Sequence, residues 1–309
     1  MRHQASTVGV LALVATAVMW GSNHVVARGV HDVVPLAALV FWRWAIALVL
    51  LTPVALGALG RSRAVIRDNL ADLVFIGAVG VGLFSLFLIA GAYYSLAIEV
   101  GMINATTPAW VAVILVATGQ ARVALSSWVG LVVAFAGTAM IMTRGSPEVL
   151  FALDVRLGNL WALIAAVLFA WFSIRLRRYS GRIEPLALTV VTSAAGLVLV
   201  ALPFYLGSLL LADSPVLAQD RNQLSLALWA VGYIALGPTM VANFLYVFGV
   251  SRVGPERAAA FIYLSPVASS VLSVVFLGEA FRWFKLVGFV LILGGLVVMN
   301  RGSTEDSRE

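Results

Sequence analysis

The sequence predicts an all-α membrane protein with ten transmembrane helices, arranged as two inverted five-helix repeats. Three observations support this fold class: the composition, the length of the apolar runs, and a likeness between the two halves of the chain. Hydrophobic residues make up 62% of the 309 residues and charged residues 11%, against roughly 45–50% and about 25% in soluble domains. So few charged residues cannot cover the surface of a soluble protein. The composition therefore excludes soluble enzymes, nucleic-acid-binding proteins and disordered chains.

The apolar runs are long enough to cross a bilayer, which takes about 20 mostly apolar residues. We expect ten spans, at 7–27, 36–57, 71–95, 102–119, 126–143, 158–176, 185–211, 225–250, 255–277 and 284–300. Spans three and four separate at Ile98-Glu99-Val100-Gly101, and spans eight and nine at Ser251-Arg252-Val253-Gly254-Pro255, where charge, Gly and Pro together end a helix. The segments between spans are short, so we expect no extramembrane domain.

The first span has an alternative interpretation as a cleaved signal peptide. Arg2 and His3 would form its basic start, and Ala15-Thr16-Ala17 resembles a cleavage site. The apolar run continues past that site, however, and Trp20 has a counterpart in the second half of the chain. We therefore expect this helix to be retained.

The basic residues predict how the helices are oriented. If the N-terminus is cytoplasmic, the inner segments hold 13 of the 20 basic residues, the outer segments hold 6, and Arg43 lies within span two. Short cytoplasmic loops are enriched in Lys and Arg, so both termini are expected in the cytoplasm. The chain contains no cysteine, which excludes disulfides and Cys-ligated metal sites.

The two halves of the chain resemble each other. Residues 129–137 match residues 287–295 at an offset of 158, and the same offset places Pro108 on Pro266. An offset of 153 places Tyr93 on Tyr246 earlier in each half. Any two runs of Leu, Val, Ala and Gly look alike, but here Trp, Gly and Pro also match in order, which favours a repeat.

The repeat divides the chain into residues 1–145, with helices one to five, residues 146–302, with helices six to ten, and a cytoplasmic tail at 303–309. Because five is odd, the second copy enters the membrane with the opposite orientation. Inverted repeats supply two bundles that can rock about a site at their interface, as in many secondary transporters.

Several motifs resemble those of EamA-type repeats in the drug/metabolite transporter superfamily. They are Met19-Trp20-Gly21-Ser22-Asn23, Phe41-Trp42-Arg43-Trp44, and Leu264-Ser265-Pro266 followed by Gly278-Glu279. The stretch from Ala97 to Asn104 is similar to the YddG-type aromatic amino-acid exporters of this superfamily. The resemblance implies an exporter of aromatic and other neutral amino acids in the bacterial inner membrane. One departure is Gly119-Gln120, where EamA repeats usually carry Gly-Glu.

Polar and aromatic residues deep inside the spans are the candidates for a substrate site, because positions that face lipid do not require them. Helical spacing places Trp20, Asn23 and His24 on one face, and Thr239, Asn243 and Tyr246 on another. Together with four further helices, the predicted substrate-binding residues are Trp20, Asn23, His24, Tyr93, Tyr94, Asn104, Trp110, Trp171, Asn243, Tyr246, Tyr263 and Ser265. They would form an aromatic-walled cavity suited to a zwitterion with a large side chain.

Each candidate also has a structural alternative. Trp and Tyr often mark the membrane interface, which is the better interpretation for the tryptophans near helix ends: Trp42, Trp44, Trp128, Trp161, Trp229 and Trp283. Ser and Thr within a span usually bond to their own helix or to a neighbouring one. Asn side chains favour a cavity or interhelix role, because an unpaired amide in hydrocarbon is costly.

Prolines and glycines inside the spans predict helix shape. Pro108 and Pro266 are expected at a hinge or kink in matching helices. Either the carbonyl group freed by each proline faces the cavity, or the kink only shapes the bundle. Gly130, Gly137, Gly288 and Gly295 are expected to let helices five and ten pack closely.

His24 and Arg43 lie deep within spans one and two. His24 can carry a coupling proton, but a neutral hydrogen-bonding role is the better interpretation. Arg43 lies about 10 Å into span two at 1.5 Å per residue. It either snorkels outward, which we expect, or helps hold a substrate carboxylate. No carboxylate lies mid-span; Glu99 and Glu279 are at helix ends.

The sequence favours a secondary transporter for a small molecule, without a cofactor or a metal. No nucleotide-binding loop is present, and the spans contain no paired aspartates, Ser–His couple or metal motif for an intramembrane enzyme. Carriers of another small metabolite or a drug remain an alternative, as does a receptor or channel. The lipid bilayer is the expected environment, nucleic acid is not an expected partner, and no oligomeric state is predicted.

Overall fold

The computed structural model describes residues 2–120, 125–146, 148, 156–179, 181–211, 215–218, 220–253, 261 and 264–305. Every regular element in these ranges is helical, which confirms the all-α prediction. Seven of the described helices are long and apolar enough to cross a membrane, and three shorter apolar ones lie at Trp128–Ile141, Leu264–Leu277 and Trp283–Gly295. These ten segments fall on the ten predicted spans.

The first half of the chain forms five spans. They are α1 (Arg2–Gly29), α2 (Leu36–Asp68), the continuous run α3 (Leu70–Gly77), η1 (Ala78–Leu83) and α4 (Phe84–Tyr94), the broken pair α5 (Ala97–Asn104) and α6 (Thr107–Ala117), and α7 (Leu125–Met142). Helix α2 has 33 residues, or about 50 Å at 1.5 Å per residue. Because the hydrocarbon core is only about 30 Å thick, its basic end beyond the predicted limit of residue 57 extends out of the bilayer.

The second half repeats this order. Its spans are α9 (Leu157–Leu176) with η2 (Arg177–Tyr179), the run α10 (Pro185–Gly196), η3 (Leu197–Ala201) and α11 (Leu202–Leu211), then η4 (Arg221–Gln223) followed by α12 (Leu224–Ile234), η5 (Ala235–Val241) and α13 (Ala242–Val253), then α15 (Leu264–Leu277) and α16 (Trp283–Glu305). Both η1 and η5 are π-helical. They interrupt the third span of each half, and such turns often occur at functional sites.

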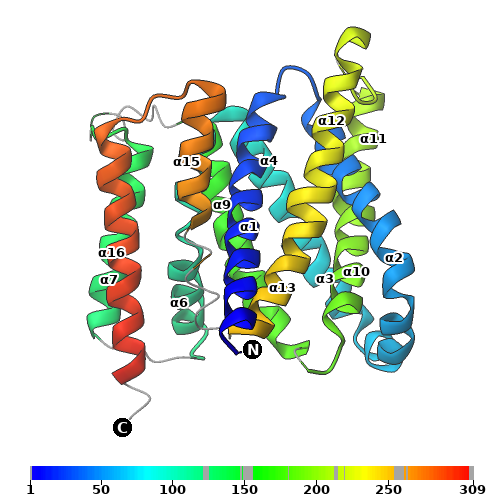
Figure 1. Ribbon diagram of the computed structural model, residues 1–309, viewed down its shortest axis with the longest axis horizontal. Coiled ribbons are helices and arrows are strands. Elements are labelled where there is room, and N and C mark those ends of the chain that lie inside the picture. Colours follow the sequence, from blue (N-terminus) through cyan, green and yellow to red (C-terminus); the bar gives the residue numbers. More distant parts are fainter. Residues whose placement is uncertain are drawn as a thin grey trace.

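Helix α1 lies near the middle of the bundle (Figure 1), where it contacts α13 and α15. Helices α7 and α16 form one end of the bundle, and α2, α10 and α11 form the other. Helix α1 begins and α16 ends at the same edge of the bundle. The contact of α1 with α15 is close, because a Cβ added at Gly21 would lie 2.6 Å from the carbonyl oxygen of Ser265.

Helices α7 and α16 pack through facing glycines, as the sequence predicts. A Cβ added at Gly137 would lie 2.5 Å from the carbonyl oxygen of Gly288, and one added at Gly288 would lie 2.8 Å from that of Gly137. Such backbone-to-backbone contact is possible only for residues without a side chain. These glycines are therefore part of the scaffold.

Candidate functional site

Helices α1 and α13 bring two predicted aromatic residues together. The ring centroids of Trp20 and Tyr246 lie 5.3 Å apart, with the ring planes inclined at 43°. Thr16 joins the same two helices, because its hydroxyl donates to the carbonyl oxygens of Ala12 at 2.9 Å and Ala242 at 3.2 Å. The aromatic pair borders a narrow recess that is lined by Leu13, Thr16, Ala17, Trp20, Tyr246 and Phe261.

Next to this aromatic pair, α1 carries two buried polar side chains with incomplete hydrogen bonding. Asn23 is 6% exposed and His24 is 4% exposed. Among the residues that the structure describes, Asn23 Oδ1 and His24 Nδ1 have no hydrogen-bond partner. The His24 ring borders α5, since a Cβ added at Gly101 would lie 3.7 Å from His24 Cδ2. Buried polar groups are normally paired, so these two atoms are available to a ligand.

Two other helices contribute similar groups. The Oδ1 atom of Asn104 on α5 and the hydroxyl of Thr239 in the π-helical turn η5 are buried without a partner in the described part of the chain. Asn243 differs, because its Nδ2 donates to the carbonyl oxygen of Thr239 at 2.6 Å. Its amide therefore holds the π-helical turn in place.

Arg43 on α2 is the residue that sequence reasoning placed incorrectly. Its side chain does not snorkel: the residue is 6% exposed, and its guanidinium lies 5.2 Å from the ring centroid of Trp44. Trp44 is buried as well and donates from Nε1 to Ser85 Oγ at 3.0 Å, so it is not an interface residue. The sequence does show that Arg43 lies about two turns into a span, and a cation at that depth is by itself a reason to expect a functional site.

Other predicted residues lie apart from the Trp20–Tyr246 pair. Tyr93 donates its hydroxyl to the carbonyl oxygen of Val34 at 2.8 Å, which ties α4 to the segment between α1 and α2. Tyr94 is 57% exposed and faces outward. Trp171 packs edge-to-face against Phe75 at 5.7 Å, within the contact of α9 with α3.

Three further predicted residues complete the comparison. Trp110 packs against Phe135 at 4.7 Å, and its Nε1 is buried without a partner in the described residues. Ser265 contributes its backbone to the close contact with Gly21. Tyr263 lies outside the described residues. Of the expected hinge prolines, Pro108 is the second residue of α6 and lies in its first turn, and Pro266 lies in α15.

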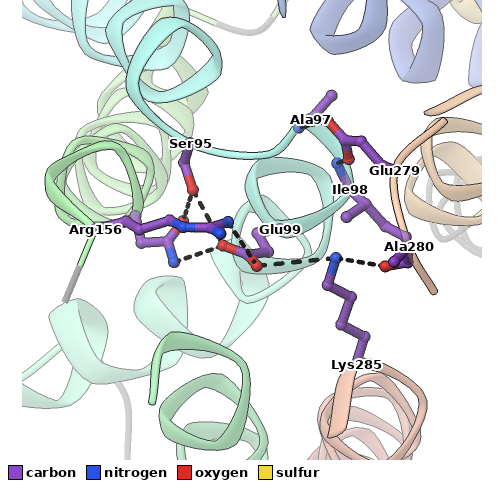
Figure 2. Close-up of polar contacts among 9 residues, drawn as sticks. Ser95, Ala97, Ile98, Glu99, Arg156, Glu279, Ala280 and Lys285 are labelled. Carbon is purple, nitrogen blue, oxygen red and sulfur yellow. Dashed lines mark hydrogen bonds and ion pairs between the residues drawn. The ribbon is translucent and has the colours of Figure 1, made fainter. Parts of the chain in front are cut away.

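A second polar cluster lies where α4, α5, α9 and α16 meet (Figure 2). Glu99 is 1% exposed, and its carboxylate accepts hydrogen bonds from Ser95 Oγ at 3.1 Å, Asn159 Nδ2 at 2.9 Å and Arg156 Nη1 at 3.2 Å. The ammonium group of Lys285 lies 3.9 Å from Glu99 Oε1 and donates to the carbonyl oxygen of Ala280 at 3.0 Å. The cluster therefore joins a carboxylate of the first half to two cations of the second.

Glu279 completes this cluster by capping a helix of the other half. Its carboxylate accepts hydrogen bonds from the backbone N–H groups of Ala97 at 2.9 Å and Ile98 at 3.2 Å (Figure 2). A carboxylate at a helix N-terminus is favourable because it pairs free N–H groups and complements the helix dipole. The start of α5 is thus held by the connection between α15 and α16.

The opposite edge of the bundle also carries ion pairs between the halves. Asp72 on α3 pairs with Arg175 on α9 and accepts a hydrogen bond from the Tyr179 hydroxyl at 2.6 Å. Near the end of α2, Arg61 binds both carboxylate oxygens of Glu184, at 2.5 and 2.8 Å. The Arg61 guanidinium holds the pKa of the Glu184 carboxyl below its usual value.

Comparison with known proteins identifies a matching family. The model of the EamA-like transporter family matches residues 7–143 and again 156–301, which confirms the two-repeat architecture. A solved crystal structure of a protein with 21% sequence identity superposes with a TM-score of 0.59 and covers 96% of each chain. At that identity it supports the fold alone.

Two curated relatives span most of the chain. The "Uncharacterized transporter YetK" of Bacillus subtilis is 26% identical over 295 residues, which cover 93% of this chain and 85% of the relative. The "Probable terminal-alkyne amino-acid exporter" of Streptantibioticus cattleyicolor is 27% identical over 306 residues, covering 97% and 96% of the two chains. The closer resemblance to YddG-type exporters stays a prediction.

Proposed function

Because the chain belongs to the EamA-like transporter family, we propose that it is a secondary transporter that exports aromatic and other neutral amino acids by alternating access. The observation that carries this proposal is the pairing of Trp20 from the first half with Tyr246 from the second, beside a recess between α1 and α13. A substrate held between the two halves is what rocking of inverted repeats requires. The name of the amino-acid exporter in Streptantibioticus cattleyicolor supports the substrate class.

The chemistry around the recess suits an amphipathic zwitterion. Aromatic rings offer large contact surfaces to an aromatic or branched side chain, and the unpartnered atoms of Asn23 and His24 offer directed hydrogen bonds. The side chains around the recess leave no room for even a water molecule between them, whereas ligand pockets usually begin near 300 Å³. The two halves must therefore move apart before a substrate enters, and the ion pairs at the two edges are the contacts that such a movement breaks.

Loss of either aromatic ring should weaken transport. Trp20→Ala or Tyr246→Ala removes one wall of the recess, and we expect counterflow of labelled phenylalanine in proteoliposomes to fall by roughly tenfold, the effect of losing one aromatic contact. Trp229→Ala is the matched control, because Trp229 also stacks on a tyrosine, at 5.4 Å from Tyr233, but is 58% exposed. That variant should transport at the wild-type rate.

Three outcomes contradict parts of this proposal. Wild-type rates in both aromatic variants would show that the site lies elsewhere. Counterflow of another metabolite or a drug without any amino-acid counterflow would replace the substrate class. Formation of a chemically altered product would show an enzyme rather than a carrier.

We further propose that both termini are cytoplasmic, as the distribution of basic residues indicates. The start of α1 and the end of α16 lie at one edge of the bundle (Figure 1), as an even number of crossings requires. A reporter that is active only in the periplasm should give no signal when fused after Glu309, and a strong signal when inserted after Asp32. The reverse pattern would show that both termini are periplasmic and that the orientation of the bundle is opposite to the one proposed.

A further inference from the structure

Arg43 is a buried cation without an anion. It is 6% exposed, and its Nε and Nη1 atoms have no hydrogen-bond partner in the described part of the chain. No Asp or Glu among the described residues forms an ion pair with it. An unpaired charge within a membrane protein is costly and marks a substrate or ion pathway by default. The site is therefore complete only when an anion is present.

The surroundings hold the guanidinium in place without neutralising it. The ring of Trp44 lies under it at 5.2 Å, and Ser85 fixes that ring through the Trp44 Nε1 hydrogen bond of 3.0 Å. Cation–π contact offsets only part of the cost of burying a charge. The contact thus orients the guanidinium and leaves its N–H groups free for an anion.

His24 on α1 and Arg43 on α2 lie at similar distances from the adjacent ends of their helices. Five residues separate His24 from Gly29 at the end of α1, and seven residues separate Arg43 from Leu36 at the start of α2. At 1.5 Å per residue these separations are about 8 and 10 Å. Asn23 precedes His24, and its buried Oδ1 atom has no hydrogen-bond donor in the described part of the chain.

From this geometry we infer that Arg43 binds the carboxylate of the transported substrate, which makes the substrate an organic monoacid or zwitterion. The inference rests on the proposed transport function and adds the group that recognises the substrate. A guanidinium presents two parallel N–H groups that match the two oxygens of a carboxylate. An α-amino acid also needs an acceptor for its ammonium group, and Asn23 Oδ1 on α1 is a buried acceptor without a donor in the described part of the chain.

Charge balance favours a carboxylate over a phosphate. A phosphate monoester carries close to two negative charges at pH 7, and one guanidinium balances only one of them. Other basic residues near the bundle interior already have partners: Arg28 donates to the carbonyl oxygen of Tyr93, and Arg156 and Lys285 pair with Glu99. A singly charged carboxylate leaves the site neutral.

The test separates recognition of the carboxylate from transport itself. In proteoliposomes, counterflow of labelled phenylalanine is inhibited with unlabelled phenylalanine or with phenethylamine, which lacks the carboxylate. For the wild type we expect phenylalanine to inhibit at least roughly tenfold better, as the loss of a hydrogen bond to a charged group implies. Arg43→Gln should raise the KM for phenylalanine by a similar factor and remove this preference. Arg43→Lys keeps the charge but loses the paired N–H groups of the guanidinium. Its KM for phenylalanine should lie between those of the wild type and Arg43→Gln.

A binding measurement keeps the two proposals distinguishable. Phenylalanine should raise the melting temperature of the purified wild-type protein and of Arg61→Gln, whose arginine is exposed, but not that of Arg43→Gln. If the wild type transports phenylalanine and Arg43→Gln keeps its preference for the acid, the inference is wrong and the proposed function stands. If no carboxylate stabilises the wild type, or chloride alone stabilises it as well as phenylalanine does, the inference is also wrong. If no amino acid shows counterflow with the wild-type protein, the proposed function is wrong.

Discussion

Replacing Glu99 with Gln should destabilise the folded protein by about 3–5 kcal/mol, the cost of removing one partner from a buried ion pair. The substitution preserves the shape of the side chain but leaves Lys285, which is 1% exposed, without a carboxylate at 3.9 Å. It also removes the charge that Arg156 faces at 3.2 Å. Unfolding in mixed micelles with increasing SDS measures the change.

Glu184→Gln is the matched control for this prediction. It also removes one charge from an Arg–Glu pair, but the side chains of Arg61 and Glu184 are 68% and 41% exposed. Exposed ion pairs contribute little to stability, so little change is expected. Adding Lys285→Gln to Glu99→Gln should recover part of the loss, because the unpaired cation is then gone. Equal effects of Glu99→Gln and Glu184→Gln would show that the Glu99 cluster does not stabilise the bundle.

Gly295→Val should separate α16 from α7 and destabilise the protein by about 3 kcal/mol, the upper part of the usual range for overpacking. A Cβ at position 295 would lie 2.6 Å from the backbone nitrogen of Ala134. Backbone atoms inside a helix cannot move away by themselves, so the whole helix must shift. The same SDS titration, followed by the fluorescence of Trp128 and Trp283, measures the loss.

The neighbouring glycine provides the control. A Cβ at Gly294 would meet no atom within 4 Å, and this residue is exposed on the same helix. Gly294→Val should therefore leave stability nearly unchanged, since the side chain would extend into lipid. If the two variants lose equal stability, the cause is valine in the helix rather than the contact with α7.

The positions of the spans were predictable because a segment that crosses the hydrocarbon core must be apolar along its whole length. The predicted range 185–211 coincides with α10 to α11, and 126–143 differs from α7 by one residue at each end. The prediction failed where charge was involved. Span four begins at Ala97 and not at 102, because Glu99 is buried with its partners, whereas the sequence alone marks a carboxylate as a helix boundary.

The candidate site was predictable only in part. Trp20 and Tyr246 were placed by helical periodicity, and the structure brings their rings together. Tyr93 and Tyr94 point in different directions, because neighbouring residues of a helix are about 100° apart. Tyr94 is accordingly exposed while Tyr93 is bonded to the segment after α1. Periodicity identifies a face of a helix but not the helix that covers it.

The sequence by itself determined the membrane environment, the number of helices and the two-repeat order, since these follow from apolar length, composition and internal likeness. Only the tertiary structure decided which charges are paired. Glu99 lies 57 residues from Arg156 along the chain, yet the two side chains form an ion pair, whereas Nε and Nη1 of Arg43 are buried without a hydrogen-bond partner among the described residues. The energy of a charge depends on the groups within a few ångströms of it, and packing between distant segments brings those groups together.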